Sequence, residues 1–147
     1  NATLEKVMFN NSLFKNMSMA NTSFSEVKIQ GSIIYEVKFT SAKMSKMYLD
    51  NVQGTNIHFN KVAIKDFKVS NSAFQNSVFS NEGGSKFNLT NVNLGDTYFD
   101  NYNLEDSSFS KVNLAKTIFK NSKIHRTNFS NSKMEQIAMI NCDSSLS

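Results

Sequence analysis

The sequence lacks proline and has a single cysteine, and both absences limit what the chain can be. Its 147 residues include no proline and only one cysteine, Cys142. Without proline, backbone N–H groups stay available for the hydrogen-bonded ladders of β-structure. One cysteine excludes an internal disulfide, which favours a reducing compartment. No apolar run is long enough to span a membrane, and no signal peptide is recognisable.

Apolar residues recur at every fifth position, and the register does not slip. These positions, here called the anchors, are residues 4, 9, 14 and every fifth residue to 139; only Gly54 and Gly84 interrupt them. A period of five fits neither the helix period of about 3.6 nor the strand period of about 2. A fixed short repeat of this kind indicates a solenoid.

Two further positions of the repeat have a clear composition. Two residues before the anchor lies a small or β-branched residue, as at Val7 or Ser12, and two residues after it lies the corner position, often Asn, as at Asn11. Side chains two apart in an extended segment point to the same side, so the anchor and the small residue should both face inward. Asn tolerates turn and left-handed conformations, which suits it to a corner.

This unit resembles the pentapeptide-repeat family, most clearly in the segments 2–5, 92–95 and 112–115, which read ATLE, VNLG and VNLA. The resemblance implies an all-β fold, a right-handed quadrilateral parallel β-helix (a solenoid) with 20 residues per coil and therefore about seven coils. We expect residues 1–147 to form a single domain that is a fragment of a longer protein. Large residues at the small position predict local irregularities at Met17, Met47, Ile57, Phe67, Phe87, Tyr102 and Ile137.

With 20 residues per coil, residues 20 apart should stack into columns at about 4.8 Å. One anchor column is almost entirely phenylalanine, which predicts a stacked aromatic ladder: Met19, Phe39, Phe59, Phe79, Phe99, Phe119 and Met139. One corner column alternates in charge at every coil, which avoids like charges on adjacent strands: Lys6, Glu26, Lys46, Asp66, Lys86, Asp106 and Arg126. We expect Gly54 and Gly84 each to leave an anchor site empty.

The sequence offers no set of residues for catalysis. His58 and His125 fall on different faces, more than three coils apart, and the acidic residues are spread over all faces. We therefore predict no catalytic, cofactor-binding or metal-binding residues and no enzyme in this segment, while the full-length protein stays open. The net charge is +4. Its distribution over the faces gives no basic stripe, which argues against nucleic acid as a partner.

Outward apolar residues favour a non-catalytic protein-binding module. The first-choice site is the predicted column Val78, Tyr98 and Ile118, and the second choice is Leu13, Ile33 and Tyr35. Contiguous exposed apolar patches mark protein–protein sites. The alternative is that outward Val, Ile and Tyr only favour strand formation.

The resemblance implies two more specific roles. Some pentapeptide-repeat proteins inhibit or protect the topoisomerase DNA gyrase by mimicking DNA, which requires an acidic surface that this chain lacks. Others form the substrate- or host-protein-binding domain of bacterial type III effectors, including HECT-like ubiquitin ligases. That second role predicts a host ubiquitin-pathway protein as partner and either a cytoplasmic location or secretion into a host cell. Oligomers could form through the coil ends.

Overall fold

The computed structural model describes residues 2–144, except for the side chains of 82–85. Within these residues the chain forms 17 strands and no helix. The strands are β1 (Ala2–Glu5), β2 (Met8–Asn10), β3 (Leu13–Lys15), β4 (Ser18–Ala20), β5 (Thr22–Ser25), β6 (Lys28–Gln30), β7 (Ile33–Tyr35), β8 (Lys38–Thr40), β9 (Lys43–Asp50), β10 (Gln53–Thr55), β11 (His58–Asn60), β12 (Ala63–Gln75), β13 (Val78–Asn93), β14 (Tyr98–Asn103), β15 (Ser108–Ser110), β16 (Ile118–Lys120) and β17 (Ala138–Ile140).

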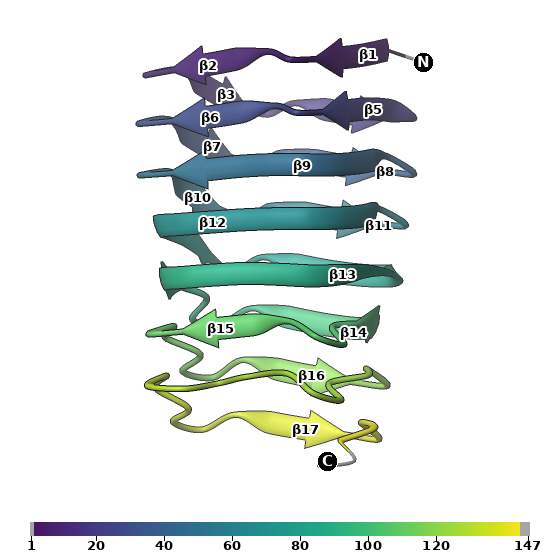
Figure 1. Cartoon of the computed structure of the whole chain (residues 1–147), viewed down its shortest axis with the longest axis vertical. Helices are drawn as coiled ribbons and strands as arrows, with labels where there is room; N and C mark the ends of the chain where they lie inside the picture. Colours follow the sequence, from purple (N-terminus) through teal and green to yellow (C-terminus); the bar gives the residue numbers. More distant parts are fainter. Residues whose placement is uncertain (1, 145–147) are drawn as a thin grey trace.

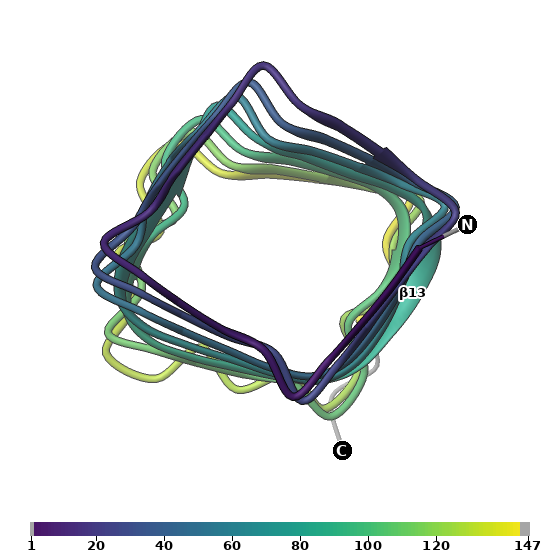
Figure 2. The ribbon, with the colours of Figure 1, turned by 90° about the horizontal axis from the view of Figure 1, so that it is seen from above.

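Every strand pairs in parallel with segments one coil away, and paired residues are 20 apart in sequence. Leu4 pairs with Phe24, and Phe119 pairs with Met139. The chain thus winds as a stack of about seven coils with the termini at opposite ends (Figure 1). Seen from above, the coils outline four sides and turn clockwise away from the viewer (Figure 2), so the helix is right-handed. The predicted quadrilateral β-helix is confirmed.

The four sides are named here by their anchors in the first coil. Face 1 contains Leu4 and every twentieth residue after it, face 2 contains Phe9, face 3 contains Phe14 and face 4 contains Met19, each with the same spacing. Consecutive faces meet at the corner positions, which begin at Lys6. These names are used for the surfaces below.

Each corner is made by one residue in the left-handed conformation. Every corner position from Lys6 to Asn141 has φ between 48° and 62°, and Gly31 is the only glycine among them. This conformation is costly for most L-residues. It costs least for Gly, which has no side chain, and for Asn and Asp, whose short side chains can hydrogen-bond to the backbone locally. No corner position is β-branched or aromatic. The frequent Asn is therefore explained by backbone geometry, as predicted.

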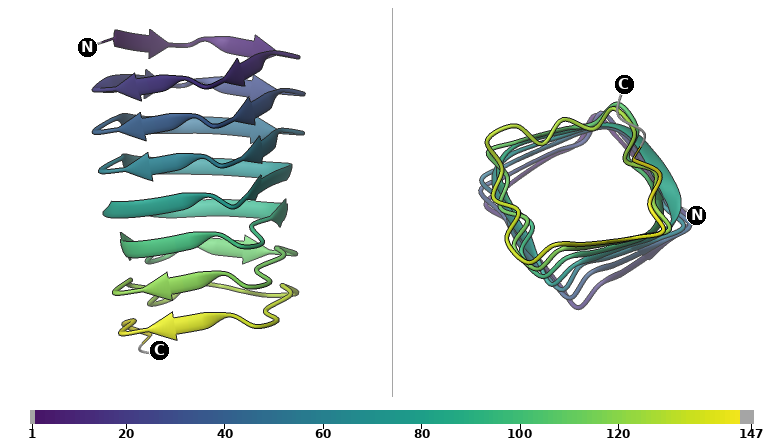
Figure 3. Two further views of the ribbon diagram at one scale, coloured as in Figure 1. Left: turned by 180° about the vertical axis from the view of Figure 1, so that it is seen from behind. Right: turned by 90° about the horizontal axis from the view of Figure 1, so that it is seen from below.

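In the later coils, several corners are also closed by a hydrogen bond between residues three apart in the sequence. The N–H of Thr117 donates to the carbonyl of Leu114 at 2.9 Å, and the N–H of Thr97 donates to that of Leu94 at 3.2 Å. The later coils have loops that bulge outward, whereas the early coils run straighter (Figure 3). Buried threonines tie consecutive coils together: the hydroxyl of Thr117 donates to the carbonyl of Leu94 in the preceding coil at 2.9 Å.

The predicted phenylalanine ladder runs through the core of face 4. The rings of Phe39, Phe59, Phe79, Phe99 and Phe119 stack nearly parallel, with centroids 4.5 to 5.1 Å apart. All five are buried. Stacked pairs of this kind add about 0.5–1.5 kcal/mol each beyond the burial of their area.

The irregularities expected at large residues in the small position do not disturb the register. Met47, Phe67, Phe87 and Tyr102 are buried, and their strands stay paired with residues 20 apart. Ile57 is buried between β10 and β11, whereas near the two ends Ile137 is half-buried and Met17 is 40% exposed. Met47, Phe67 and Phe87 are each followed two residues later by an anchor of modest size: Leu49, Val69 and Leu89. A large residue at the small position is thus accompanied by a smaller anchor, as close packing requires.

The prediction that Gly54 leaves an empty anchor site is wrong. A Cβ atom at Gly54 would lie 2.8 Å from the Cδ1 atoms of Ile57 and Phe74 and from the carbonyl oxygen of Ala73. The larger side chain of Ile57 fills the space that the anchor would have taken, so glycine is required there. The same expectation for Gly84 falls outside the side chains that the structure describes.

Truncating the aromatic ladder should destabilise the fold strongly. Phe99→Ala removes a fully buried ring between Phe79 and Phe119, and we expect a loss of about 3–5 kcal/mol in the free energy of unfolding. Tyr98→Ala, on the outward side of the same strand, should cost less than half of that. Chemical denaturation measures both. Equal losses would contradict the inward and outward assignment.

Changing the corner residue should separate backbone strain from side-chain contacts. Asn101 has φ of 53° and its side chain is exposed. Asn101→Val should cost about 1–2 kcal/mol, because a β-branched residue fits the left-handed region poorly. Asn101→Gly should be close to neutral, because glycine adopts the same φ freely. The comparison of the two midpoints in denaturant is the measurement; a glycine variant as unstable as the valine variant would refute this account.

Candidate functional site

The first-choice residues lie in one outward column on face 4. Tyr98 in β14 pairs with Val78 in β13 and with Ile118 in β16, and Ala138 in β17 continues the column. Val78 and Tyr98 are half-buried and Ile118 is 37% exposed. The next residue in each of these three strands belongs to the phenylalanine ladder. The column therefore lies directly over the stacked rings of the core.

The second-choice residues lie together near the other end of the solenoid. Leu13 in β3 pairs with Ile33 in β7, and they are 64% and 51% exposed, more than any residue of the first column. Tyr35 lies two positions along β7, with the ammonium of Lys15 at 5.6 Å from its ring centroid. A hydrogen bond with Glu36 and the charge of that carboxylate raise the pKa of Tyr35.

Face 2 has a further group of outward residues that sequence reasoning did not single out. Met8 in β2 is 56% exposed and Tyr48 in β9 is 40% exposed, and Lys28 in β6 pairs with both. Lys68 in β12 pairs with Tyr48 on the next coil. The apolar residues alternate with lysines in this column, so no run of apolar residues drew attention to it. Sorting every outward position into columns would have found it.

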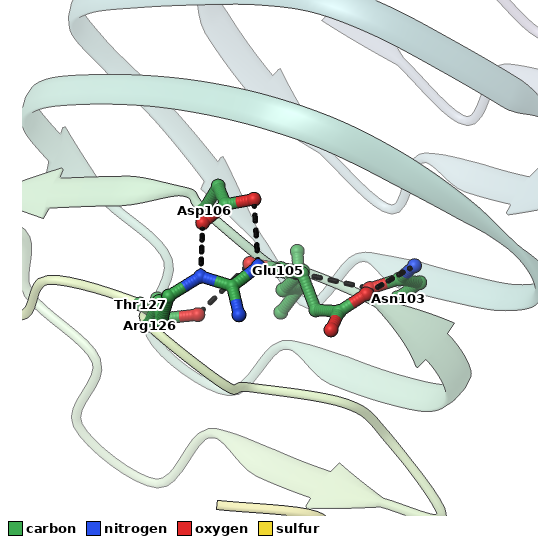
Figure 4. Close-up of polar contacts among 6 residues, drawn as sticks. Asn103, Glu105, Asp106, Arg126 and Thr127 are labelled. Carbon is green, nitrogen blue, oxygen red and sulfur yellow. Dashed lines mark hydrogen bonds and ion pairs between the residues drawn. The ribbon is translucent and has the colours of Figure 1, made fainter. Parts of the chain in front are cut away.

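The alternating corner column forms ion pairs between coils. The Nζ atom of Lys46 lies 3.0 Å from Oε1 of Glu26. Arg126 donates two hydrogen bonds to Asp106, from Nε at 2.6 Å and from Nη2 at 3.0 Å (Figure 4). These partners hold the pKa values of Glu26 and Asp106 below their usual range. Lys6 instead lies 3.8 Å from its sequence neighbour Glu5.

Titratable side chains that could hold a metal ion or act as a nucleophile include His, Cys, Asp and Glu. In the described part of the chain, no three His, Cys, Asp or Glu residues come together in a way that could hold a metal ion. The thiol of Cys142 is partly buried against the core, and its sulfur lies 3.3 Å from the carbonyl oxygen of Phe119.

None of the described residues forms a helix with the length and hydrophobicity needed to cross a membrane.

Part of the chain matches a known family of repeat proteins. The pentapeptide repeats model matches eight copies, over residues 88–126 and 103–136. The left-handed corner at every fifth residue and the pairing at 20 residues continue through the coils that precede this match. Residues 88–136, about a third of the chain, therefore match the pentapeptide repeats family, and the described residues as a whole form a four-sided β-helix.

Two solved structures support the fold independently of the sequence. Both are trypsin-treated forms of QnrB1, described as a plasmid-mediated fluoroquinolone resistance protein. One aligns with a TM-score of 0.58 and 14% identity over 92% of this chain and 83% of that chain. The other aligns with a TM-score of 0.56 and 12% identity over 95% of this chain and 91% of that chain. At this level of identity the likeness shows the fold alone. No curated protein matches the chain.

The charge alternation should contribute to stability in a salt-dependent way. Asp106→Lys would place a third positive charge between Lys86 and Arg126 in one column, so we expect a lower melting temperature at low ionic strength. The loss should shrink in about 1 M NaCl, where the Debye length falls to about 3 Å.

Asn101→Lys is the matched control, because its corner neighbours are Asn81 and Asn121 and carry no charge. Its melting temperature relative to wild type should not depend on salt. A loss for Asp106→Lys that is the same at both ionic strengths would show that charge is not the cause.

Proposed function

We propose that the chain is a non-catalytic protein-binding solenoid and that its contact site is the face 4 column of Val78, Tyr98 and Ile118. The observation that carries this is an uninterrupted outward apolar run: these residues pair in register at successive coils, and Ala138 extends them. Aromatic residues such as Tyr98 dominate binding energy at protein interfaces, since they bury a large area with few rotatable bonds.

The rigid support beneath the column favours binding. The stacked rings of Phe79, Phe99 and Phe119 hold the three strands in place. Little conformational entropy is then lost when a partner binds, which leaves more of the contact energy as affinity. Leu13 and Ile33 are more exposed, but their column continues with Gln53, so they form the second candidate site.

The resemblance supports a more specific form of this proposal. In it, the partner is a host ubiquitin-pathway protein, and the chain is the substrate-binding domain of a bacterial effector with a HECT-like ligase region elsewhere in the full-length protein. The described residues hold no group of side chains suited to ligase chemistry, so such a chain would contribute binding only. Ubiquitin transfer to a captured partner by the full-length protein, lost when this solenoid is deleted, tests the specific form.

Topoisomerase protection is the second candidate function. The observation that favours it is the shared fold with QnrB1, a plasmid-mediated fluoroquinolone resistance protein. The charge of this chain argues against it, because a DNA mimic needs an acidic surface, whereas the net charge here is +4 and the charged corner column alternates in sign. Rescue of gyrase supercoiling from a fluoroquinolone by the purified protein would favour this function over the first.

The proposed site is tested by paired substitutions once a partner has been captured. Tyr98→Asp with Ile118→Asp should weaken binding by about 2 kcal/mol or more, roughly thirtyfold in Kd, because both residues would lose apolar contact. Isothermal titration calorimetry measures the change, and circular dichroism checks that the β-helix is intact.

Gln53→Asp with Ala73→Asp on face 3 is the matched control, because it adds the same charge to outward positions of neighbouring coils. This pair should leave the Kd within about twofold of wild type. Undiminished binding by the Tyr98 and Ile118 variant would refute the site. A loss confined to Leu13→Asp with Ile33→Asp would move it to face 3.

A further inference from the structure

A shallow groove runs along face 2 across the first four coils. Its volume is about 910 Å³. Met8, Lys28, Tyr48 and Lys68 stack along it in one outward column, each on a neighbouring coil. The column changes character at the next coil, where Asn88 pairs with Lys68. The groove is on a different face from the column proposed above and does not depend on it.

Two lysines in the groove have no carboxylate partner. Among the described residues, neither Lys28 nor Lys68 forms an ion pair, and the Lys28 ammonium lies 6.0 Å from the ring centroid of Tyr48. The acidic residues at the edges are already engaged. Glu26 is paired with Lys46, and Asp50 accepts hydrogen bonds from Ser70 at 2.8 Å and from Asn71 at 3.0 Å.

Glu26 is paired with Lys46 and Asp50 lies at one edge, so Lys28 and Lys68 leave positive charge on both sides of the exposed ring of Tyr48. The hydrogen bonds from Ser70 and Asn71 lower the pKa of Asp50, so this carboxylate stays ionised at one edge. A ligand that fits must therefore present negative charge to Lys28 and Lys68 and an apolar group to Tyr48. It must also keep its carboxylates away from the Asp50 edge.

The spacing of the lysines indicates the conformation of such a ligand. Lys28 and Lys68 are separated by two strand spacings, or about 10 Å. Polyproline II helix rises about 3.1 Å per residue with three residues per turn, so every third side chain lies on one face about 9.3 Å apart. Exposed aromatic residues are the usual docking surface for this conformation.

We propose that the face 2 groove binds an acidic, extended segment of a partner protein in polyproline II conformation, with carboxylates at every third position. The carboxylates would pair with Lys28 and Lys68, an apolar residue between them would pack on Tyr48, and one beyond Lys28 would pack on Met8. A protein segment fits better than nucleic acid, since two free cations flank an apolar centre and the basic column stops at Asn88. Phosphate tracking needs a longer basic stripe.

The probe for this site is a fluorescein-labelled peptide with the sequence (Glu-Pro-Leu) repeated four times. Fluorescence anisotropy should show binding to the wild-type protein that weakens as salt is raised. Lys28→Gln with Lys68→Gln should weaken binding by about tenfold or more, because both charge contacts are lost. Tyr48→Ala should weaken it by about fivefold, because the apolar contact at the centre is lost.

Lys43→Gln with Lys65→Gln on face 1 is the matched control, since it removes the same charge from outward positions of adjacent coils. This pair should change the Kd by about twofold at most. The peptide (Gln-Pro-Leu) repeated four times should not bind. Thermal melting verifies that each variant is folded.

Three outcomes would overturn the proposal. The first is an absence of binding by the acidic peptide, and the second is an equal loss in both lysine pairs, which would show attraction by net charge alone. The third is tight binding of a thymidine oligonucleotide that the Lys28 and Lys68 substitutions abolish, which would assign the groove to nucleic acid. None of these results bears on the face 4 column, whose test uses different residues and a captured partner.

Discussion

The left-handed corner at every fifth residue is the constraint on which the rest of this structure depends. It turns the chain by a fixed amount after each short side, so four repeats close one coil and each residue lies beside the one 20 positions later. Corner N–H groups also donate to carbonyls of the following coil: that of Lys6 to Ser25 at 2.9 Å in the first coil, and that of Asn121 to Ile140 at 2.8 Å near the last. The strained backbone is thereby paired, and an insertion of one residue anywhere would misalign every column after it.

Regular stacking turns small differences in sequence into continuous features. Inside, it converts one phenylalanine per coil into a ladder of parallel rings from Phe39 to Phe119. Outside, it converts single charges into the alternating corner column, in which Glu26 meets Lys46 and Asp106 meets Arg126. The two features differ in how much they contribute to the free energy of unfolding. Buried rings contribute several kcal/mol each, whereas an exposed ion pair contributes about 0–1 kcal/mol and acts mainly on register.

The same stacking explains how the solenoid can present specific surfaces. An outward side chain has no freedom to move away from its neighbours, because its strand is paired on both sides and its inward neighbour is buried. Val78, Tyr98 and Ile118 therefore form a ready apolar strip, and Lys28, Tyr48 and Lys68 form a charged and aromatic one. The two strips lie on opposite faces, so partners of different chemistry could bind at the same time.

The sequence by itself determined the repeat, the coil length and the columns, because each depends only on spacing along the chain. The phenylalanine ladder and the left-handed Asn corners follow from that spacing and are confirmed in detail. Only the tertiary structure decided how space is shared between positions. It showed that Ile57 fills the site beside Gly54, that Tyr98 is half-buried while Leu13 is largely exposed, and that lysines flank an exposed tyrosine on face 2. Those outcomes depend on side-chain rotamers and on packing against side chains of adjacent coils, and neither can be read from the spacing of residues along the chain.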